Sequence, residues 1–274
     1  MSLQNKGVTP DVLYLSATPI PRTYALTIYG DLDISMIKTK PNGRKDIVTK
    51  LVKEKEIKSV LYAILEEFKK GHQVYVVSPL IEENDELDLK SVNILKDQFS
   101  KAFPGISIDI LHGKLKNDEK NKIMDDFKNG KTKILISTTV IEVGIDVKNA
   151  TMMIIYNAER FGLATLHQLR GRVGRGSDES FCFLISNYDS ERLHVLEESN
   201  DGFYISEKDF ELRGAGDMFG VKQSGDMVFK IANLQKDYDL LLKAKDDSEE
   251  FLKTNEYLKY DYYKKLIDDI KFID

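Results

Sequence analysis

Apolar runs and amphipathic stretches alternate along most of the chain. The clearest helical pattern is 57–68, where apolar residues recur every three or four positions and Gly71 stands where a C-terminal cap belongs. Other helices are predicted at 92–99, 118–127 and 163–169, and strands at 12–15, 74–78, 106–111, 133–137, 151–156 and 180–185. This alternation predicts an α/β fold with a doubly wound parallel sheet.

The pattern changes after about residue 188. Short helical stretches lead into RGAGDMFGVKQSG (213–225), whose glycines predict a flexible loop, and charged helices follow. The first predicted strand, 12–15, has no preceding strand to pair with, so we expect a truncated upstream domain. The predicted parts are a trailing segment with a linker (1–45), the α/β domain (46–188) and a helical appendage (189–274).

Composition excludes several classes of protein. The 274 residues are 42% hydrophobic and 31% charged, without an apolar run of about 18 residues, so we expect no membrane span. The net charge of -5 argues against a protein that coats nucleic acid, so any DNA contact is expected to be local. The single cysteine, Cys182, cannot form an internal disulfide and is predicted to be a buried thiol in the cytoplasm.

The segment QLRGRVGR (168–175) carries the strongest candidate chemistry. Gln168, Arg172 and Arg175 are spaced i, i+4 and i+7, so a helix continuing through the segment would present them on one face. No acidic residue lies between Arg160 and Ser177, so the arginines of this stretch form a cationic island: Arg160, Arg170, Arg172 and Arg175. Guanidinium groups match phosphate oxygens and stabilise the charge of a departing γ-phosphoryl group. An arginine finger is predicted; surface arginines paired with distant carboxylates are the alternative.

A second segment, ILISTTVIEVGIDV, places hydroxyls directly after a predicted buried strand. Thr138 and Thr139 follow the strand, and the next loop carries Gly144 and Asp146. Strand ends of this kind bind ligands in α/β proteins, and short hydroxyls with free backbone N–H groups suit phosphate. The alternative is structural, with the threonines capping the strand exit and Asp146 capping the next turn.

Two further strand ends carry candidate residues. In SATPIPRT, Ser16 and Thr18 lie in a turn that Pro19 and Pro21 stiffen, although the same turn would suit an ordinary helix entry. In LHG (111–113), Gly113 allows a ligand to approach the backbone closely. His112 beside it is either a ligand contact or a structural histidine.

In chain order, SATPIPRT, STTVIEVGIDV and QLRGRVGR resemble motifs III, V and VI of superfamily 2 helicases. The resemblance implies a RecA-like second helicase domain, with Arg172 and Arg175 facing the nucleotide and Gln168, Gly144 and Asp146 beside them. It also implies that Thr138 contacts the nucleic-acid backbone, and that Ser16 and Thr18 link hydrolysis to DNA movement. His112 and Gly113 are grouped with these DNA contacts.

One departure from the superfamily pattern concerns the nucleotide site. The chain contains no GxxxxGK[ST] loop and no DExH box. ATP and Mg2+ are therefore expected only in a longer protein, and the isolated chain is expected to be inactive, to bind neither, and to turn Arg172 and Arg175 toward solvent.

The segment ELRGAGDMFGVKQSG (211–225) looks like the translocation motif shared by the RecG and Mfd families, both double-stranded DNA motors. ALTIYGDLDISMIKTKPNGRKDI and SPLIEENDELDLKSV follow the RecG pattern more closely. This resemblance makes Arg213 and Gln223 candidates for transmitting motion, although Arg213 would also suit a simple ion pair within a hairpin.

The resemblance implies a helical translocation appendage and an ATP-dependent DNA helicase that remodels forks and Holliday junctions. The expected partners are DNA and the missing wedge and first RecA-like domains, with no membrane. The alternatives are an Mfd-like translocase that acts on RNA polymerase and a non-catalytic binding module with a helicase fold.

Overall fold

The computed structural model describes residues 45–79, 85–138, 147–218 and 237–265, together with four isolated positions between 13 and 39. The predicted strand 12–15 and five candidate residues lie outside the described residues: Ser16, Thr18, Gly144, Asp146 and Gln223. The described residues fall into two compact units, one of residues 45–212 and one of 213–218 and 237–265.

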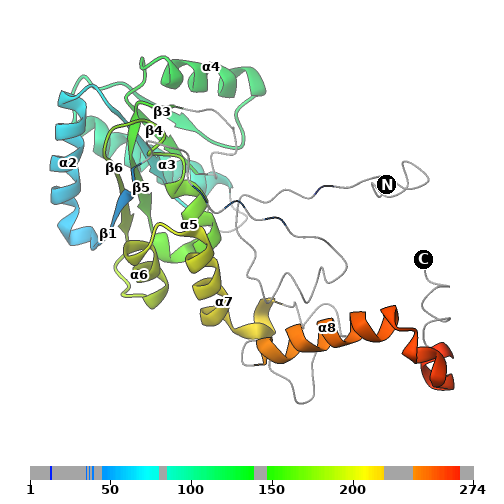
Figure 1. The fold of residues 1–274 in the computed structure, drawn as a ribbon. Coiled ribbons are helices and arrows are strands. Elements are labelled where there is room, and N and C mark those ends of the chain that lie inside the picture. The colour runs from blue at the N-terminus through cyan, green and yellow to red at the C-terminus, as the bar shows by residue number, and fades with distance from the viewer. Residues whose placement is uncertain are drawn as a thin grey trace. The chain divides into compact units, whose positions relative to one another are not determined.

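Six strands form one parallel sheet in the first unit (Figure 1). In spatial order they are β1 (Ile47–Val52), β6 (Ser180–Ile185), β5 (Ala150–Tyr156), β2 (Gln73–Val77), β4 (Ile134–Ser137) and β3 (Ile108–Leu111). The five strands from β2 to β6 confirm the predicted apolar runs. Sequence reasoning missed β1 because this edge strand alternates buried and exposed positions, so that IVTKLV contains no continuous apolar run.

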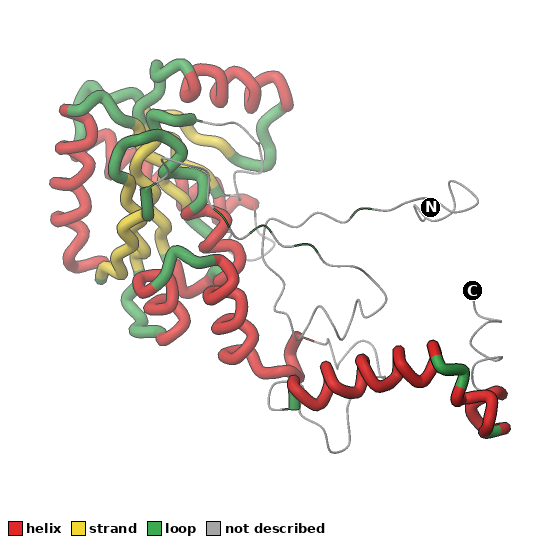
Figure 2. Tube along the Cα trace, in the orientation of Figure 1, coloured by secondary structure: helices red, strands yellow, loops and turns green. Residues whose placement is uncertain are grey.

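Helices flank the sheet (Figure 2). Those of the first unit are α2 (Ile57–Lys69), α3 (Asp85–Ala102), α4 (Asn117–Lys128), α5 (Leu163–Arg170) and α6 (Glu191–Glu198). The helix α7 (Gly202–Met218) begins in the first unit, and α8 (Tyr238–Lys253) lies in the second. The described residues also contain three short 3-10 helices: η2 (Glu54–Glu56), η3 (Ala158–Arg160) and η4 (Glu256–Lys259).

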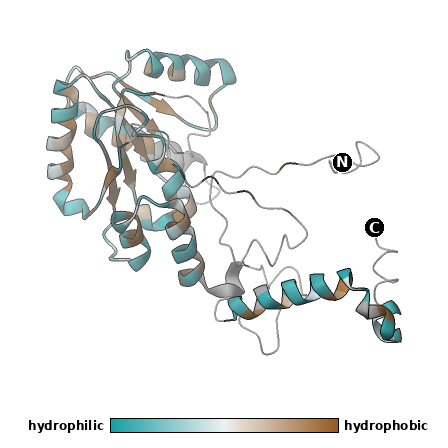
Figure 3. Ribbon diagram, viewed as in Figure 1, coloured by the Kyte–Doolittle hydropathy of each residue, from teal (hydrophilic) through white to brown (hydrophobic). Residues whose placement is uncertain are grey.

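The sheet buries both faces, as a doubly wound fold requires. In β2, Val74 and Val76 belong to a core shared with α2 and α3, whereas Tyr75 and Val77 belong to a core shared with α4, α5 and α6. This alternation follows from the two-residue period of a strand. Figure 3 shows the strands in brown and the outer helix faces largely in teal. The predicted doubly wound parallel α/β fold is confirmed.

Part of the predicted flexible loop is helical, because α7 extends into it. The helix continues to Met218, so Gly214 and Gly216 lie in helical backbone. Glycine weakens a helix without forbidding it, and extending a helix is easier than starting one. The buried side chains of Ile205 and Phe210 anchor the beginning of α7. The unit that holds the sheet therefore extends to Leu212, whereas the functional division at 188–189 stays a prediction.

Candidate nucleotide and nucleic-acid site

Three candidate residues meet at the carboxyl edge of the sheet. The last residues of β3 and β4, Leu111 and Ser137, are register partners, so His112 and Thr138 follow neighbouring strand ends. Thr138 is buried, and the adjacent strand β2 is joined to the same edge by the Ser78 N–H, which donates to Ser137 O at 2.9 Å. Thr138, His112 and Gly113 thus form one group, which we call the carboxyl-edge group.

The His112 ring is partly buried beside two lysines. Burial of the ring, with smaller contributions from Lys120 and Lys114, lowers the pKa of His112 below its ordinary value. The ring is therefore neutral near pH 7, and the buried Nδ1 atom has no hydrogen-bond partner among the residues that the structure describes. Lys120 Nζ donates to the Gly113 carbonyl at 2.9 Å, which holds a positive charge beside this edge.

Among the described residues, neither the surroundings nor the backbone conformation of Gly113 requires a glycine. A Cβ atom placed on Gly113 would meet nothing within 4 Å, and its φ is not in the left-handed region. No atom of the described residues would therefore block a molecule that approaches this exposed backbone.

The helix α5 ends before the candidate arginines. Gly171 caps the helix, and Gly174 adopts a left-handed φ of +70°, so the backbone turns away from the helix axis. The condition for one shared helical face of Gln168, Arg172 and Arg175, a helix that continues through Gly171, is therefore not met. Gln168 lies on α5, whereas both arginines lie on residues 171–176, which we call the arginine loop.

Two glycines fix the arginine loop against the amino edge of the sheet. A Cβ atom on Gly174 would lie 2.9 Å from Cγ1 of Ile47, and one on Gly176 would lie 2.9 Å from the Lys148 carbonyl oxygen. Ile47 begins β1, and Lys148 lies just before β5. The arginine loop is therefore at the edge opposite to the carboxyl-edge group, while Lys148 follows Asp146 by two positions in the sequence.

The arginines differ in environment. Arg170 is only 2% exposed, so it does not belong to the predicted cationic island on the surface. Arg172 and Arg175 are partly exposed, less open to solvent than predicted. Arg175 Nε donates to the Gly171 carbonyl at 3.4 Å. Among the described residues, Arg172 forms hydrogen bonds only through its main chain, where its N–H donates to Leu169 O at 3.0 Å.

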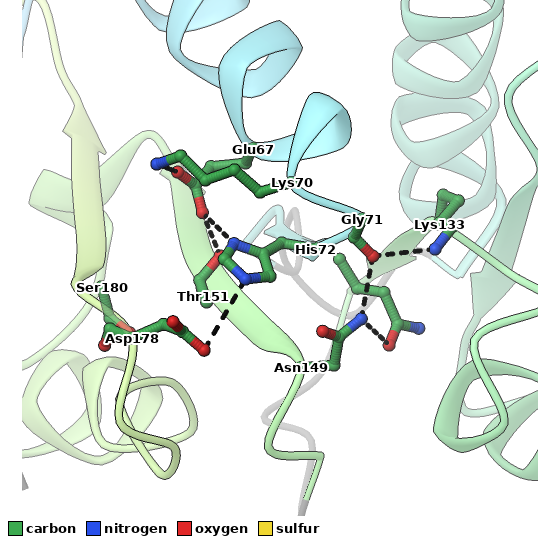
Figure 4. A network of polar contacts seen from close by, with 10 residues as sticks. Glu67, Lys70, Gly71, His72, Lys133, Asn149, Thr151, Asp178 and Ser180 are labelled. Atoms are coloured by element: carbon green, nitrogen blue, oxygen red, sulfur yellow. Dashed lines mark hydrogen bonds and ion pairs between the residues drawn. The ribbon is translucent and has the colours of Figure 1, made fainter.

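A buried polar network lies at the amino edge (Figure 4). The Glu67 carboxylate accepts hydrogen bonds from Lys70 Nζ at 2.7 Å and Thr151 Oγ1 at 2.5 Å, and it lies 2.6 Å from His72 Nδ1. The other ring nitrogen of His72 is 3.7 Å from Asp178, which follows the arginine loop. The network thus joins the end of α2 and the start of β5 to the segment that carries the arginines.

Sequence reasoning missed two polar residues near the end of β5. Arg192 Nη2 donates to the Glu159 main-chain oxygen at 2.5 Å. Within the described ranges, each side chain also has one buried polar atom without a partner, Nε of Arg192 and Oε2 of Glu159. The two residues are 33 positions apart, so no local motif indicates their contact.

The described residues offer no resident metal site. They contain no group of three His, Cys, Asp or Glu side chains able to hold a metal ion. Cys182 is the predicted buried thiol, and burial raises its pKa to about 12, so it remains protonated. No helix in the described ranges is both long and apolar enough to cross a membrane.

The geometry of the arginine loop predicts a stability effect for Gly174→Ala. We expect the substitution to lower the unfolding free energy by about 2 kcal/mol, because the left-handed φ disfavours a Cβ atom and Ile47 must also move. Gly130→Ala is the matched control, since Gly130 has a φ of +74° but open space around its Cβ position. Denaturant unfolding of both variants checks the prediction, which equal losses for the two would contradict.

Comparison with protein families gives the class. Residues 39–177, about half of the chain, match the helicase conserved C-terminal domain. The chain therefore belongs to the helicase conserved C-terminal domain family, with the RecA-like fold that the sequence predicts. Residues 199–273 match the C-terminal part of domain 3 of the ATP-dependent DNA helicase RecG.

Individual relatives point to RecG as well. The chain is 46% identical over 273 residues to the ATP-dependent DNA helicase RecG of Bacillus subtilis (strain 168), covering 98% of this chain and 40% of the relative. It is 48% identical over 248 residues to RecG of Streptococcus pneumoniae serotype 4, covering 89% and 37%. The chain thus spans about 40% of the length of such relatives.

A solved structure agrees with these relatives. The structure of RecG bound to a three-way DNA junction matches with a TM-score of 0.68 and 44% identity, over 88% of this chain and 32% of that chain.

Proposed function

We propose that this chain is the C-terminal part of an ATP-dependent double-stranded DNA translocase that remodels replication forks and Holliday junctions. The observation that carries the proposal is the separation of two candidate groups, the arginine loop at the amino edge and the carboxyl-edge group at the other. A motor needs both a surface that responds to the nucleotide and a surface that contacts DNA. The similarity to RecG supplies the chemistry that each group would perform.

The arginine loop suits the phosphates of ATP. Arg172 and Arg175 would contact the γ-phosphate, and Gly144, Asp146 and Gln168 would lie beside the nucleotide. Guanidinium groups stay charged at any working pH and stabilise the charge that develops as the phosphoryl group leaves. Because the chain has no P-loop, ATP would be held by a first RecA-like domain elsewhere in a longer protein. Mg2+, bound there as well, would neutralise phosphate charge.

The carboxyl-edge group suits a DNA backbone. The Thr138 hydroxyl, the neutral His112 ring and the open backbone at Gly113 are contacts that do not distinguish bases. Ser16 and Thr18 would couple hydrolysis to this contact, while Arg213 and Gln223 in the tail would transmit the motion. Binding should therefore weaken with salt and show little dependence on sequence.

The similarity to RecG also suggests the other partners of the longer protein. One RecG structure is described as bound to a three-way DNA junction, and branched DNA is the substrate that we propose for the longer protein. Its upstream wedge and first RecA-like domains would complete the ATP site and bind the branch point. The domain division at 188–189 and a cytoplasmic location belong to the same proposal.

The function is tested by comparing the isolated chain with the longer protein. We expect forked DNA to stimulate ATP hydrolysis by the longer protein and strand separation to follow, whereas the isolated chain shows no DNA-stimulated turnover. The physical reason is that the chain contains only one side of the proposed ATP site. Turnover by the pure chain, or a longer protein insensitive to forked DNA, would contradict the proposal.

A further inference from the structure

Arg170 is the most buried arginine near the arginine loop, and it connects three elements. Its Nη1 atom donates to the main-chain oxygens of Leu196 at 2.7 Å and Ser199 at 2.9 Å, and it lies 3.2 Å from Thr49 Oγ1. Its Nη2 atom is 3.1 Å from His167 Nδ1. The side chain therefore leaves the end of α5 and reaches both β1 and the carboxyl end of α6.

These contacts make Arg170 a capping group for α6 rather than a ligand contact. The last carbonyls of a helix lack partners within the helix, and a cation near them also interacts favourably with the helix dipole. Ser199 is the C-cap residue of α6, and Leu196 lies in its last turn. Burial lowers the pKa of Arg170, but a guanidinium remains charged in proteins. Arg170 therefore holds a desolvated charge on carbonyl oxygens.

Arg170 also lies close in sequence to the arginine loop, and the helix end that it caps lies close to the start of α7. Arg172, the proposed phosphate contact, lies two residues later, and α7 begins three residues after Ser199. A shift of the arginine loop would therefore be felt at the start of α7, the helix whose later turns carry Arg213. The contacts of Arg170 lie entirely within the first unit, which also contains the start of α7.

We infer that Arg170 is a positioning residue, linking the arginine loop to α6 and the start of α7, that couples ATP hydrolysis to DNA movement. The inference rests on the proposed function and deepens it. Arg170 touches neither ATP nor DNA in this account. Its removal should spare the hydrolysis that Arg172 and Arg175 support and should reduce the movement obtained from each ATP.

The test uses the longer protein and measures two rates on the same forked DNA, ATP hydrolysis and strand separation. Arg170→Met keeps much of the side-chain volume but removes the donors. We expect ATP turnover within about threefold of the unsubstituted protein, while base pairs separated per ATP fall about tenfold. Arg170→Lys keeps the charge, but its one nitrogen cannot replace both Nη1 at the two carbonyls and Nη2 beside His167, so base pairs separated per ATP should fall about threefold.

Asn200→Ala is the matched control. Asn200 ties the same region to β1, since its side chain accepts from Ile47 N at 3.3 Å and donates to Ile47 O at 3.2 Å. The substitution therefore leaves the hydrogen bonds of Arg170 in place. We expect this variant to separate a number of base pairs per ATP within about twofold of that of the unsubstituted protein. An equal loss of the ratio in Asn200→Ala would mean that general loosening of α6 is responsible, and it would overturn the inference.

The rates of the two Arg170 variants and of the unsubstituted protein also test the inference. Parallel losses of hydrolysis and strand separation in Arg170→Met, or an unchanged ratio, would overturn the inference. If Arg170→Met fails to fold, Arg170→Lys decides by the same ratio, and a normal ratio there counts against coupling. If the unsubstituted protein lacks DNA-stimulated hydrolysis, the proposed function fails instead, so the two failures are distinguishable.

Discussion

In the longer protein, Arg172→Ala is expected to lower DNA-stimulated ATP turnover by about 10²- to 10³-fold while ATP binding changes little. The guanidinium group would act mainly on charge that appears as the γ-phosphoryl group departs, so its loss should affect the turnover number more than nucleotide affinity. Among the described residues, the Arg172 side chain makes no hydrogen bond that holds the fold, so stability should be preserved. Steady-state kinetics with a direct nucleotide-binding measurement check both parts.

Arg160→Ala is the matched control for this experiment. Arg160 lies at the end of η3, is exposed, and belongs to the same acid-free stretch of sequence. It should retain normal turnover, which would separate the arginine loop from a general loss of positive charge. A near-normal turnover number for Arg172→Ala, or an equal defect in Arg160→Ala, would remove the basis for assigning the γ-phosphate to this loop.

Glu67→Ala is expected to lower the unfolding free energy by about 3 kcal/mol. The substitution removes a carboxylate whose side chain is 2% exposed and leaves Thr151 and the buried His72 ring without their partner. Equilibrium unfolding in denaturant measures the loss. The neighbouring pair Glu66 and Lys69 provides the control, since it has a similar separation of 2.6 Å but lies in solvent. Glu66→Ala should leave stability nearly unchanged.

The same carboxylate predicts a pH dependence of stability. Burial alone would raise the pKa of Glu67, but hydrogen bonds from Lys70, Thr151 and His72 outweigh it, and the pKa lies below its ordinary value. A carboxylate of this kind stabilises the fold above its unfolded-state pKa and loses that contribution as pH falls through the folded-state pKa. The difference in stability between Glu67→Ala and the unsubstituted chain should therefore shrink below about pH 4.5. A difference that grows on acidification would contradict the role of Glu67.

The sequence predicted the strands well because most of them are buried on both faces. Strands such as VYVV and MMII appear as continuous apolar runs, and they form the centre of the sheet. The edge strand β1 escaped prediction because alternating exposure makes IVTKLV resemble many other segments. Local pattern thus identifies apolar runs, including that of the other edge strand β3, more readily than a strand such as β1 whose exposure alternates.

The candidate site could be predicted by residue type but not by geometry. The spacing of Arg172 and Arg175 suggested one helical face, whereas the cap at Gly171 and the left-handed φ at Gly174 end the helix first. The burial of Arg170 depends on partners 26, 29 and 121 positions away, which no local pattern contains. Residues 139–146, where two of the nucleotide candidates lie, are outside the described ranges.

In the proposed motor, the arginine loop faces ATP while the opposite edge of the same sheet faces DNA. The most direct measurement is a structure of the longer protein with a non-hydrolysable ATP analogue and branched DNA. We predict that the guanidinium groups of Arg172 and Arg175 lie within hydrogen-bonding distance of the γ-phosphate. The DNA backbone should lie against His112, Gly113 and Thr138. A nucleotide at the carboxyl edge, or arginines directed away from its phosphates, would contradict it.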